Sequence, residues 1–207
     1  LTQGTSDSNE LWLQLSVSSG ARIIGHSGTI DATGEVDPQA HRVNAFVLDK
    51  NGNRINRRNA QDIFTPLYNH QIPPGAGQTV HYELVLPDDL DEPVTVELRL
   101  LYRKFDREYV ENFIAGRRKP GDLPLRDFTP DQPYGNPLPV TVLASDRIVF
   151  PIEGLATGDV PAVADREIPE WQRWNDYGIG LLLKGKGELR LAADAFRQVE
   201  ALGRYDG

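Results

Sequence analysis

Cysteine and methionine are both absent from the 207 residues of this chain. Without cysteine the chain has no disulfide, no thiolate metal site and no CxxCH motif through which c-type haem is attached covalently. Long apolar runs are missing as well, because the longest uncharged one, residues 179–183, is far shorter than the ~20 residues of a transmembrane helix. We therefore expect no membrane span, whereas the absence of cysteine leaves the redox compartment open.

Positive charge and catalytic signatures are also scarce. The formal net charge is −8, which argues against nucleic acid as a partner because phosphate binding needs a positively charged face. The sequence contains no GxSxG, P-loop, GxGxxG or HExxH motif. We therefore predict that the chain is not an enzyme.

Turn-forming residues and short alternating apolar segments are abundant. The chain holds 19 glycines and 15 prolines, and apolar side chains recur at every second position in several runs, a pattern typical of half-buried strands. The Asn51-Gly52 pair predicts a hairpin turn, for which a calcium loop at residues 49–53 is the weaker alternative. The predicted strands are residues 11–17, 21–24, 42–48, 80–86, 94–105, 140–143 and 148–152.

This strand pattern predicts the fold of the first three quarters of the chain. About seven or eight short strands with turns between them are buried most simply as two antiparallel sheets packed face to face. We therefore predict a mainly β chain with an immunoglobulin-like antiparallel β-sandwich over residues 11–153. A polar segment, residues 1–10, precedes the sandwich, and a linker rich in Gly, Ala, Pro and Asp follows it at residues 154–169.

After Pro169 the apolar period changes from two to 3.6, which predicts a helical hairpin over residues 170–207. The hairpin resembles a tetratricopeptide repeat in the order of its aromatic, glycine and alanine residues, with a longer turn between the helices. The matching residues are Trp174, Tyr177, Gly178, Leu181, Gly187, Ala192 and Phe196.

One such repeat cannot cover its own apolar face, so we expect further repeats, self-association, the sandwich or another chain to cover it. A chain that starts at Leu1 is moreover expected to be a piece of a longer protein or a processed product. The candidate partner-binding residues of the hairpin are Trp171, Trp174, Tyr177 and Phe196. The alternative for these aromatic side chains is packing within the helices themselves.

Four segments resemble a module of bacterial multihaem c-type cytochromes, in which a β-rich region follows the haem-binding part and precedes tetratricopeptide repeats. They read GHSG at residues 25–28, DIFTPLYNHQIPPG at 62–75, LLYRKF at 100–105 and LASDRI at 143–148. The chain departs from these proteins because it has no CxxCH motif. The resemblance implies a non-catalytic scaffold or interaction module of an exported, periplasmic or extracellular electron-transfer protein, whose haem c is carried by another segment or chain.

Histidines are the side chains of this chain best suited to bind haem iron, because a neutral imidazole is a common axial ligand. His26 lies between a glycine and a serine in a short loop, His41 follows a proline-containing loop, and His70 precedes the rigid Pro73-Pro74 corner. These three are candidate distal ligands to a haem bound outside the chain. The alternative is that they are loop histidines that hydrogen-bond backbone carbonyls. The spacing of the histidines does not favour a zinc site.

Two further functions remain open from the residues alone. A structural subunit of an extracellular filament or adhesin would use the exposed hairpin and the strand edges, which can pair between copies. A carbohydrate-binding β-sandwich has only the fold as support.

Overall fold

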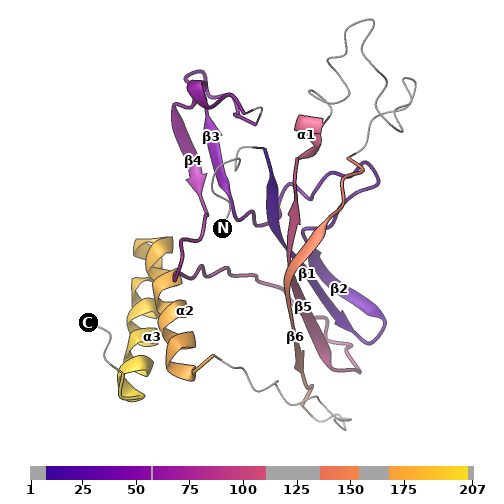
Figure 1. Cartoon of the computed structure of the whole chain (residues 1–207). Coiled ribbons are helices and arrows are strands. Elements are labelled where there is room, and N and C mark those ends of the chain that lie inside the picture. The colour runs from indigo at the N-terminus through magenta and orange to yellow at the C-terminus, as the bar shows by residue number, and fades with distance from the viewer. Residues whose placement is uncertain (1–7, 57, 111–135, 154–167, 205–207) are drawn as a thin grey trace, which may run out of the picture. The chain divides into compact units, whose positions relative to one another are not determined.

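The computed structural model describes residues 8–56, 58–110, 136–153 and 168–204 (Figure 1). The chain divides into two compact units. One, here called the β-unit, comprises Thr2–Gln71 and Leu86–Thr157, and the other, the helical unit, comprises Ile72–Val85 and Gly158–Gly207. The predicted segment 1–10 and linker 154–169 fall largely outside the described residues.

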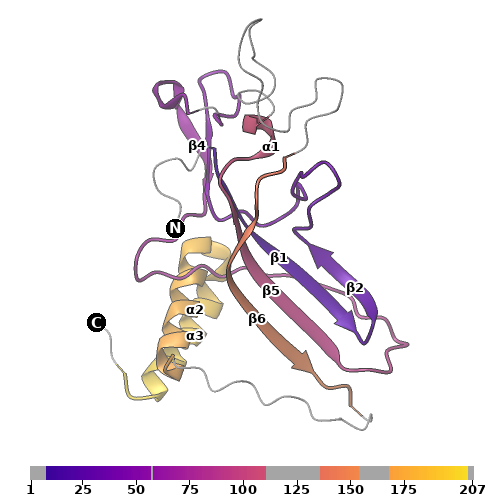
Figure 2. The ribbon, with the colours of Figure 1, turned by 45° about the vertical axis from the view of Figure 1, so that its right-hand side comes forward.

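The β-unit is built on a four-stranded antiparallel sheet in the order β2-β1-β5-β6. The strands are β1 (Glu10–Ser19), β2 (Arg22–Ser27), β5 (Val94–Arg103) and β6 (Thr141–Phe150). Figure 2 shows them side by side, with β2 and β6 at the two edges. The alternation of apolar side chains along β1 and β5 explains this pairing, because directly opposite residues share a face of the sheet.

The register of β1 and β5 gives the sheet one apolar and one mixed face. Leu13, Leu15 and Val17 lie opposite Leu100, Leu98 and Val96 and form the apolar face. On the mixed face, Gln14 and Ser16 lie opposite Arg99 and Glu97. At the end of the sheet where β1 begins, the mixed face becomes a buried core of Trp12, Val36, Ala40 and Leu101. Burial of these large apolar side chains stabilises this end of the β-unit.

A second, two-stranded antiparallel sheet consists of β3 (Ala45–Leu48) and β4 (Thr65–Asn69). The predicted Asn-Gly turn follows β3: Gly52 has a φ of +83°, and its N–H donates to the carbonyl of Asp49. The Asp49 carboxylate accepts hydrogen bonds from Asn51 N and from both Asn53 N and Asn53 Nδ2. These bonds occupy the oxygens that a calcium loop would need, so the hairpin interpretation is confirmed.

The helical unit contains a hairpin of α2 (Glu170–Lys184) and α3 (Leu189–Ala201), joined through a short 3-10 turn, η3 (Lys186–Glu188). Gly185, with a φ of +102°, ends α2, as the sequence predicts. Gly178 lies where the helices meet, because a Cβ there would stand 2.8 Å from the ring of Phe196. The residues buried between the helices include Leu181, Ala192, Ala195 and Val199.

The prediction of antiparallel strands followed by a helical hairpin is confirmed, but the strands differ in number from those predicted. The described residues form six strands, in sheets of four and two. The segments 140–143 and 148–152 belong largely to the single strand β6, because residues 144–147 pair with β5 despite their polar character. A short helix, α1 (Arg107–Tyr109), follows β5.

The predicted strand at residues 80–86 is wrong: these residues form neither helix nor strand. Their N-terminal neighbours instead contact α2, where Thr79 Oγ1 donates to the carbonyl of Tyr177 at 3.2 Å. Gly77 and Gly180 permit this contact, because a Cβ on Gly77 would stand 2.9 Å from Asp176 O and a Cβ on Gly180 would stand 2.7 Å from Thr79 N. The chain is thus held along the helix rather than within a sheet.

No helix among the described residues has the length and apolar character needed to cross a bilayer, in keeping with the prediction.

Candidate functional site

Four aromatic side chains form a continuous stack beside the two-stranded sheet, which we call the ring column. The ring centroids are 4.8 Å apart for His41 and His70, 4.6 Å for His70 and Tyr68, and 5.4 Å for Tyr68 and Phe46. Strand geometry produces this order. Phe46 and Tyr68 are paired across β3 and β4, and His70 follows Tyr68 by two residues and so projects to the same side.

His70 is oriented by the backbone as well as by the stack. Its Nδ1 lies 3.1 Å from the carbonyl oxygen of Arg42. Because a carbonyl only accepts, Nδ1 carries the proton and donates it, which leaves the lone pair on Nε2. A metal-binding histidine usually has this arrangement, since the bond from one nitrogen fixes both the tautomer and the direction of the other. The residues around His70 therefore fit the role of an axial ligand.

Arg54 covers the other end of the ring column. Its guanidinium lies 4.7 Å from the centroid of Phe46, and its Nη2 forms a 3.0 Å ion pair with Asp106 Oδ2. Burial raises the pKa of the Tyr68 phenol, against the smaller opposing effects of Arg42 and Arg54. The column thus contains a neutral phenol and two imidazoles beside a paired arginine.

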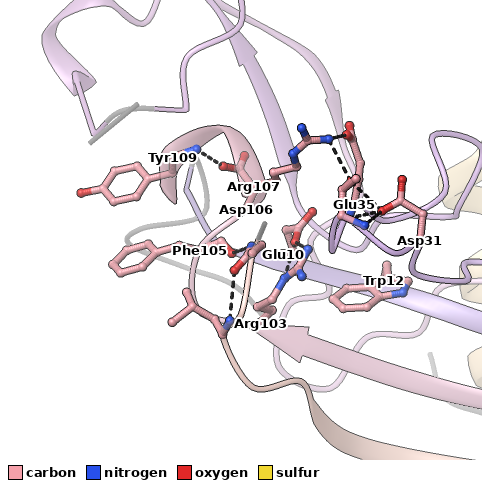
Figure 3. A network of polar contacts seen from close by, with 12 residues as sticks. Glu10, Trp12, Asp31, Glu35, Arg103, Phe105, Asp106, Arg107 and Tyr109 are labelled. Atoms are coloured by element: carbon pink, nitrogen blue, oxygen red, sulfur yellow. Dashed lines mark hydrogen bonds and ion pairs between the residues drawn. The ribbon is translucent and has the colours of Figure 1, made fainter. Parts of the chain in front are cut away.

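A buried ion network lies at the end of the four-stranded sheet where β1 begins and β5 ends. There Glu10 and Arg103 are directly opposite each other (Figure 3). Arg103 Nε donates to Glu10 Oε2 at 2.8 Å, and Arg103 Nη2 contacts the same oxygen. The other oxygen, Glu10 Oε1, accepts from Arg42 Nη1 at 3.0 Å. Two guanidinium groups offset the cost of desolvating one carboxylate. Arg42 therefore joins this network, through its side chain, to His70, through its carbonyl.

Asp106 begins α1 and is also buried. Its Oδ1 accepts a hydrogen bond from the backbone N–H of Tyr109, the N-cap arrangement visible in Figure 3. Burial raises the pKa of the Asp106 carboxyl to about 6, although the Arg54 guanidinium and the Tyr109 N–H act in the opposite direction. The ion pair between Arg54 and Asp106 is therefore sensitive to pH near neutrality.

The structure brings two of the three candidate haem ligands together and places the third elsewhere. The rings of His41 and His70 stack at an interplanar angle of 17° and do not converge on one point. The Nε2 atom of His41 is buried, so that binding a group from outside through this nitrogen would require the ring to move. No cluster of three or more His, Cys, Asp or Glu side chains in residues 8–56, 58–110, 136–153 and 168–204 is arranged to hold a metal ion.

His26 lies apart from the ring column, on the edge strand β2 opposite Ser16. Its side chain is exposed and lines an open groove of about 270 Å³ on the mixed face of the large sheet. Glu97 and Arg99 of β5 also line this groove. His26 is therefore a second, independent position from which an imidazole can reach a group on another chain.

The candidate partner-binding residues of the hairpin have different surroundings, although all are partly buried. Phe196 contacts Gly178 between α2 and α3. Trp174 packs edge-on against Tyr177 with ring centroids 6.2 Å apart, and Arg204 lies 5.6 Å from the ring of Trp171. The partner-binding role of the four residues stays a prediction.

The sequence did not predict the residues that hold the ring column in place. Tyr68 in β4 and His70, just after it, are two residues apart, which is a signal for side chains on one face, but Pro66 obscures that strand. Arg42 and Arg54 carry no such signal, because their contacts join residues that are far apart in the sequence.

The chain was compared with known proteins in three ways. No protein-family model matches it, and neither the curated proteins nor the solved structures searched include a significant match.

Proposed function

We propose that this chain is a non-catalytic scaffold and interaction module of an exported multihaem electron-transfer protein, with the haems carried by another segment or chain. The observation that carries the proposal is the bond from His70 Nδ1 to the Arg42 carbonyl. It prepares Nε2 to donate its lone pair, as in an axial ligand. The resemblance of residues 25–28, 62–75, 100–105 and 143–148 to multihaem c-type cytochromes supplies the kind of partner.

The roles of the chain's own residues follow from their contacts. Arg42 holds the His70 ring through its carbonyl, while its guanidinium is fixed by Glu10. His41 and Tyr68 cover the two faces of that ring and restrict its rotation. Haem iron bound at Nε2 would gain a nitrogen ligand whose basicity the carbonyl increases. His26 is the alternative ligand. Its ring is exposed and lies outside the ring column that orients His70.

A haem peptide with one axial histidine and an open sixth position tests this proposal. Titrating the ferric peptide with the chain should convert it from high-spin to low-spin, with a shift of the Soret band, as a second imidazole binds. His70→Ala should abolish the shift, and His26→Ala should not. His81→Ala is the matched control, because the His81 side chain is also solvent-accessible but lies near Glu188 in the helical unit. An unchanged titration with His70→Ala would contradict the proposal.

We also propose that the helical hairpin is a tetratricopeptide-type unit and that the two sheets are parts of a β-sandwich. The contact of Gly178 with Phe196 supports the first, because both residues belong to the repeat pattern and lie here against each other between the two helices. Leu189, Leu191 and Leu202 are exposed on α3 or just after it, where a following repeat would pack. Consensus repeats appended to the C-terminus should raise the melting temperature of the hairpin, and Leu191→Asp should remove that gain.

A structural subunit of an extracellular assembly is the second candidate function. One observation favours it, namely a series of exposed apolar side chains at residues 82–86 that belong to no strand. Such a segment can pair with a strand of another molecule.

A further inference from the structure

Residues 80–86 have the alternating sequence of a strand but, among the described residues, make no backbone hydrogen bond to a neighbouring strand. Val80, Tyr82, Leu84 and Leu86 alternate with His81 and Glu83, and residues 81–86 are all exposed. Tyr82, Leu84, Val85 and Leu86 are 40–87 % exposed. In the part of the chain that the structure describes, no backbone hydrogen bond involves residues 80–86. We call these residues the free segment.

Strand β6 is an edge strand of the large sheet. It ends the order β2-β1-β5-β6, is ten residues long, and is paired only on its β5 side among the described residues. Val142, Leu143 and Phe150 are 46–53 % exposed. A long edge strand with exposed apolar side chains is a template for another strand, since its outer N–H and C=O groups need partners. Edge strand β2 is shorter, with six residues.

We propose that the free segment of one molecule adds to the β6 edge of a second copy of this chain as an antiparallel fifth strand. The proposal does not rest on haem binding. It joins two surfaces of one chain, residues 80–86 and the outer edge of β6, that have no strand beside them among the described residues, and each copy carries one donor segment and one acceptor edge. Such a heterologous contact continues from molecule to molecule, into a ring or a filament.

One register pairs the opposite charges and places two apolar pairs on one face. Placing Glu83 opposite Arg147 also places Tyr82 opposite Ile148, Val80 opposite Phe150 and Leu84 opposite Asp146. Ile148 and Phe150 lie opposite Val96 and Val94 on β5 and therefore belong to the apolar face of the sheet. The apolar side chains of the free segment would extend that face.

The charges support the same alignment. Arg147 is an exposed side chain whose Nε lies 3.7 Å from Glu97 Oε1, so a second carboxylate, that of Glu83, would approach it from the open side. A shift by one residue would turn the apolar side chains of the free segment to the mixed face, and a shift by two would separate Glu83 from Arg147. The expected register is therefore unique among neighbouring ones.

Cysteine cross-linking tests the contact, because the natural chain has no cysteine to interfere. Tyr82→Cys protein mixed with Ile148→Cys protein should form a disulfide-linked dimer under mild oxidation. His81→Cys mixed with Val149→Cys tests the adjacent pair. Hydrogen-bonded and non-hydrogen-bonded pairs alternate along an antiparallel ladder and differ in the distance between their Cα atoms, so that one of the two mixtures has the spacing that suits a disulfide better. Tyr82→Cys mixed with Val149→Cys is the control that is out of register by one residue, and it should link several-fold less.

Two results would overturn the proposal. One is the absence of intermolecular links in both in-register mixtures. The other is a link that forms only when both cysteines are on one chain and gives a monomer on a non-reducing gel, which would show that the free segment pairs within its own chain.

Association of the unlinked protein gives an independent readout by sedimentation velocity. Glu83→Arg should weaken it about fivefold by opposing Arg147 with a like charge. The double variant Glu83→Arg/Arg147→Glu should restore it. Tyr82→Pro and Glu83→Pro should each leave the fold intact because no backbone bond is lost. One of the two should abolish association, since successive N–H groups point to opposite sides of a strand. A monomer at every concentration would contradict the proposal.

Discussion

Glu10 and Arg103 lie directly opposite each other on β1 and β5 and form an ion pair that is almost completely buried. Without Arg103, the buried Glu10 carboxylate retains Arg42, whose side chain is partly exposed, as a guanidinium partner. Arg103→Met should therefore reduce the free energy of unfolding of the β-unit by about 3 kcal/mol, the lower end of the cost of breaking a buried ion pair. Urea denaturation followed by circular dichroism measures this loss.

The double variant Glu10→Leu/Arg103→Met is the matched control. It should recover most of the stability, because Arg42 is partly exposed and can turn to solvent when Glu10 is absent. A double variant as unstable as Arg103→Met alone would show that the packing of the long side chain, and not its charge, is what the β-unit requires.

Gly178 should tolerate no large side chain, because its ideal Cβ position is 2.8 Å from the Phe196 ring. Gly178→Leu should lower the unfolding free energy of the hairpin by about 2 kcal/mol through overpacking, despite the better helix propensity of leucine. Gly187→Leu is the control, since a Cβ at Gly187 meets no atom within 4 Å. Phe196→Ala should partly rescue Gly178→Leu, and thermal melts of the helical signal would detect both effects.

Gly180 should control the attachment of residues 77–79 to α2. An alanine Cβ there would stand 2.4 Å from Thr79 Oγ1 and 2.7 Å from Thr79 N. Gly180→Ala should therefore displace the segment while leaving the helix itself stable, because alanine favours helix over glycine by ~1 kcal/mol. Backbone amide relaxation measured by NMR should show greater mobility at residues 77–79 than in the wild type, with α2 unchanged. Equal mobility in the two proteins would show that the segment is not held by this contact.

Asp106 should make stability fall as the pH rises through the range from about 4 to 6. Its pKa is about 6 in the folded chain and near 3.8 when unperturbed, so the folded state binds the proton more tightly. In this window the folded state holds more protons than the unfolded one, and the free energy of unfolding decreases with pH. The loss contributed by this group is on the order of 2–3 kcal/mol.

The variant Asp106→Asn isolates that contribution. Asparagine still caps α1 by accepting from Tyr109 N, but it does not titrate. Urea denaturation at pH 4.5 and pH 7 should show a smaller difference for Asp106→Asn than for the wild type. The same pH dependence in both proteins would assign the effect to another group.

Local sequence patterns predict the elements whose structure depends on local interactions. The alternation in β1 and β5, the Asn51-Gly52 turn and the change of period after Pro169 all correspond to observed elements. In each case the signal comes from side-chain periodicity or from a residue that favours one backbone conformation. The continuous strand β6 was not predictable in this way, because Asp146 and Arg147 become strand residues only by pairing with Leu98 and Glu97.

The same limit explains what was missed at the candidate site. His70 could be named from its chemistry and from the proline corner that follows it. Its orientation depends on the carbonyl of Arg42, which lies 28 residues earlier in the sequence. Conversely, residues 80–86 have a strand pattern without a neighbouring strand in the described chain, since periodicity reports the preference of a segment and not the presence of a partner.

The three tryptophans are divided between the two units, with Trp12 in the β-unit and Trp171 and Trp174 in the helical unit. Trp12 is fully buried, its indole N–H donates to the Gly28 carbonyl at 3.0 Å, and the guanidinium of Arg103 lies 5.9 Å from its ring. The double variant Trp171→Phe/Trp174→Phe would therefore leave Trp12 as the one tryptophan, buried beside the paired Arg103 guanidinium. Tryptophan emission excited selectively would then report the unfolding of the β-unit alone, so that the melting of the two units could be measured separately on one sample.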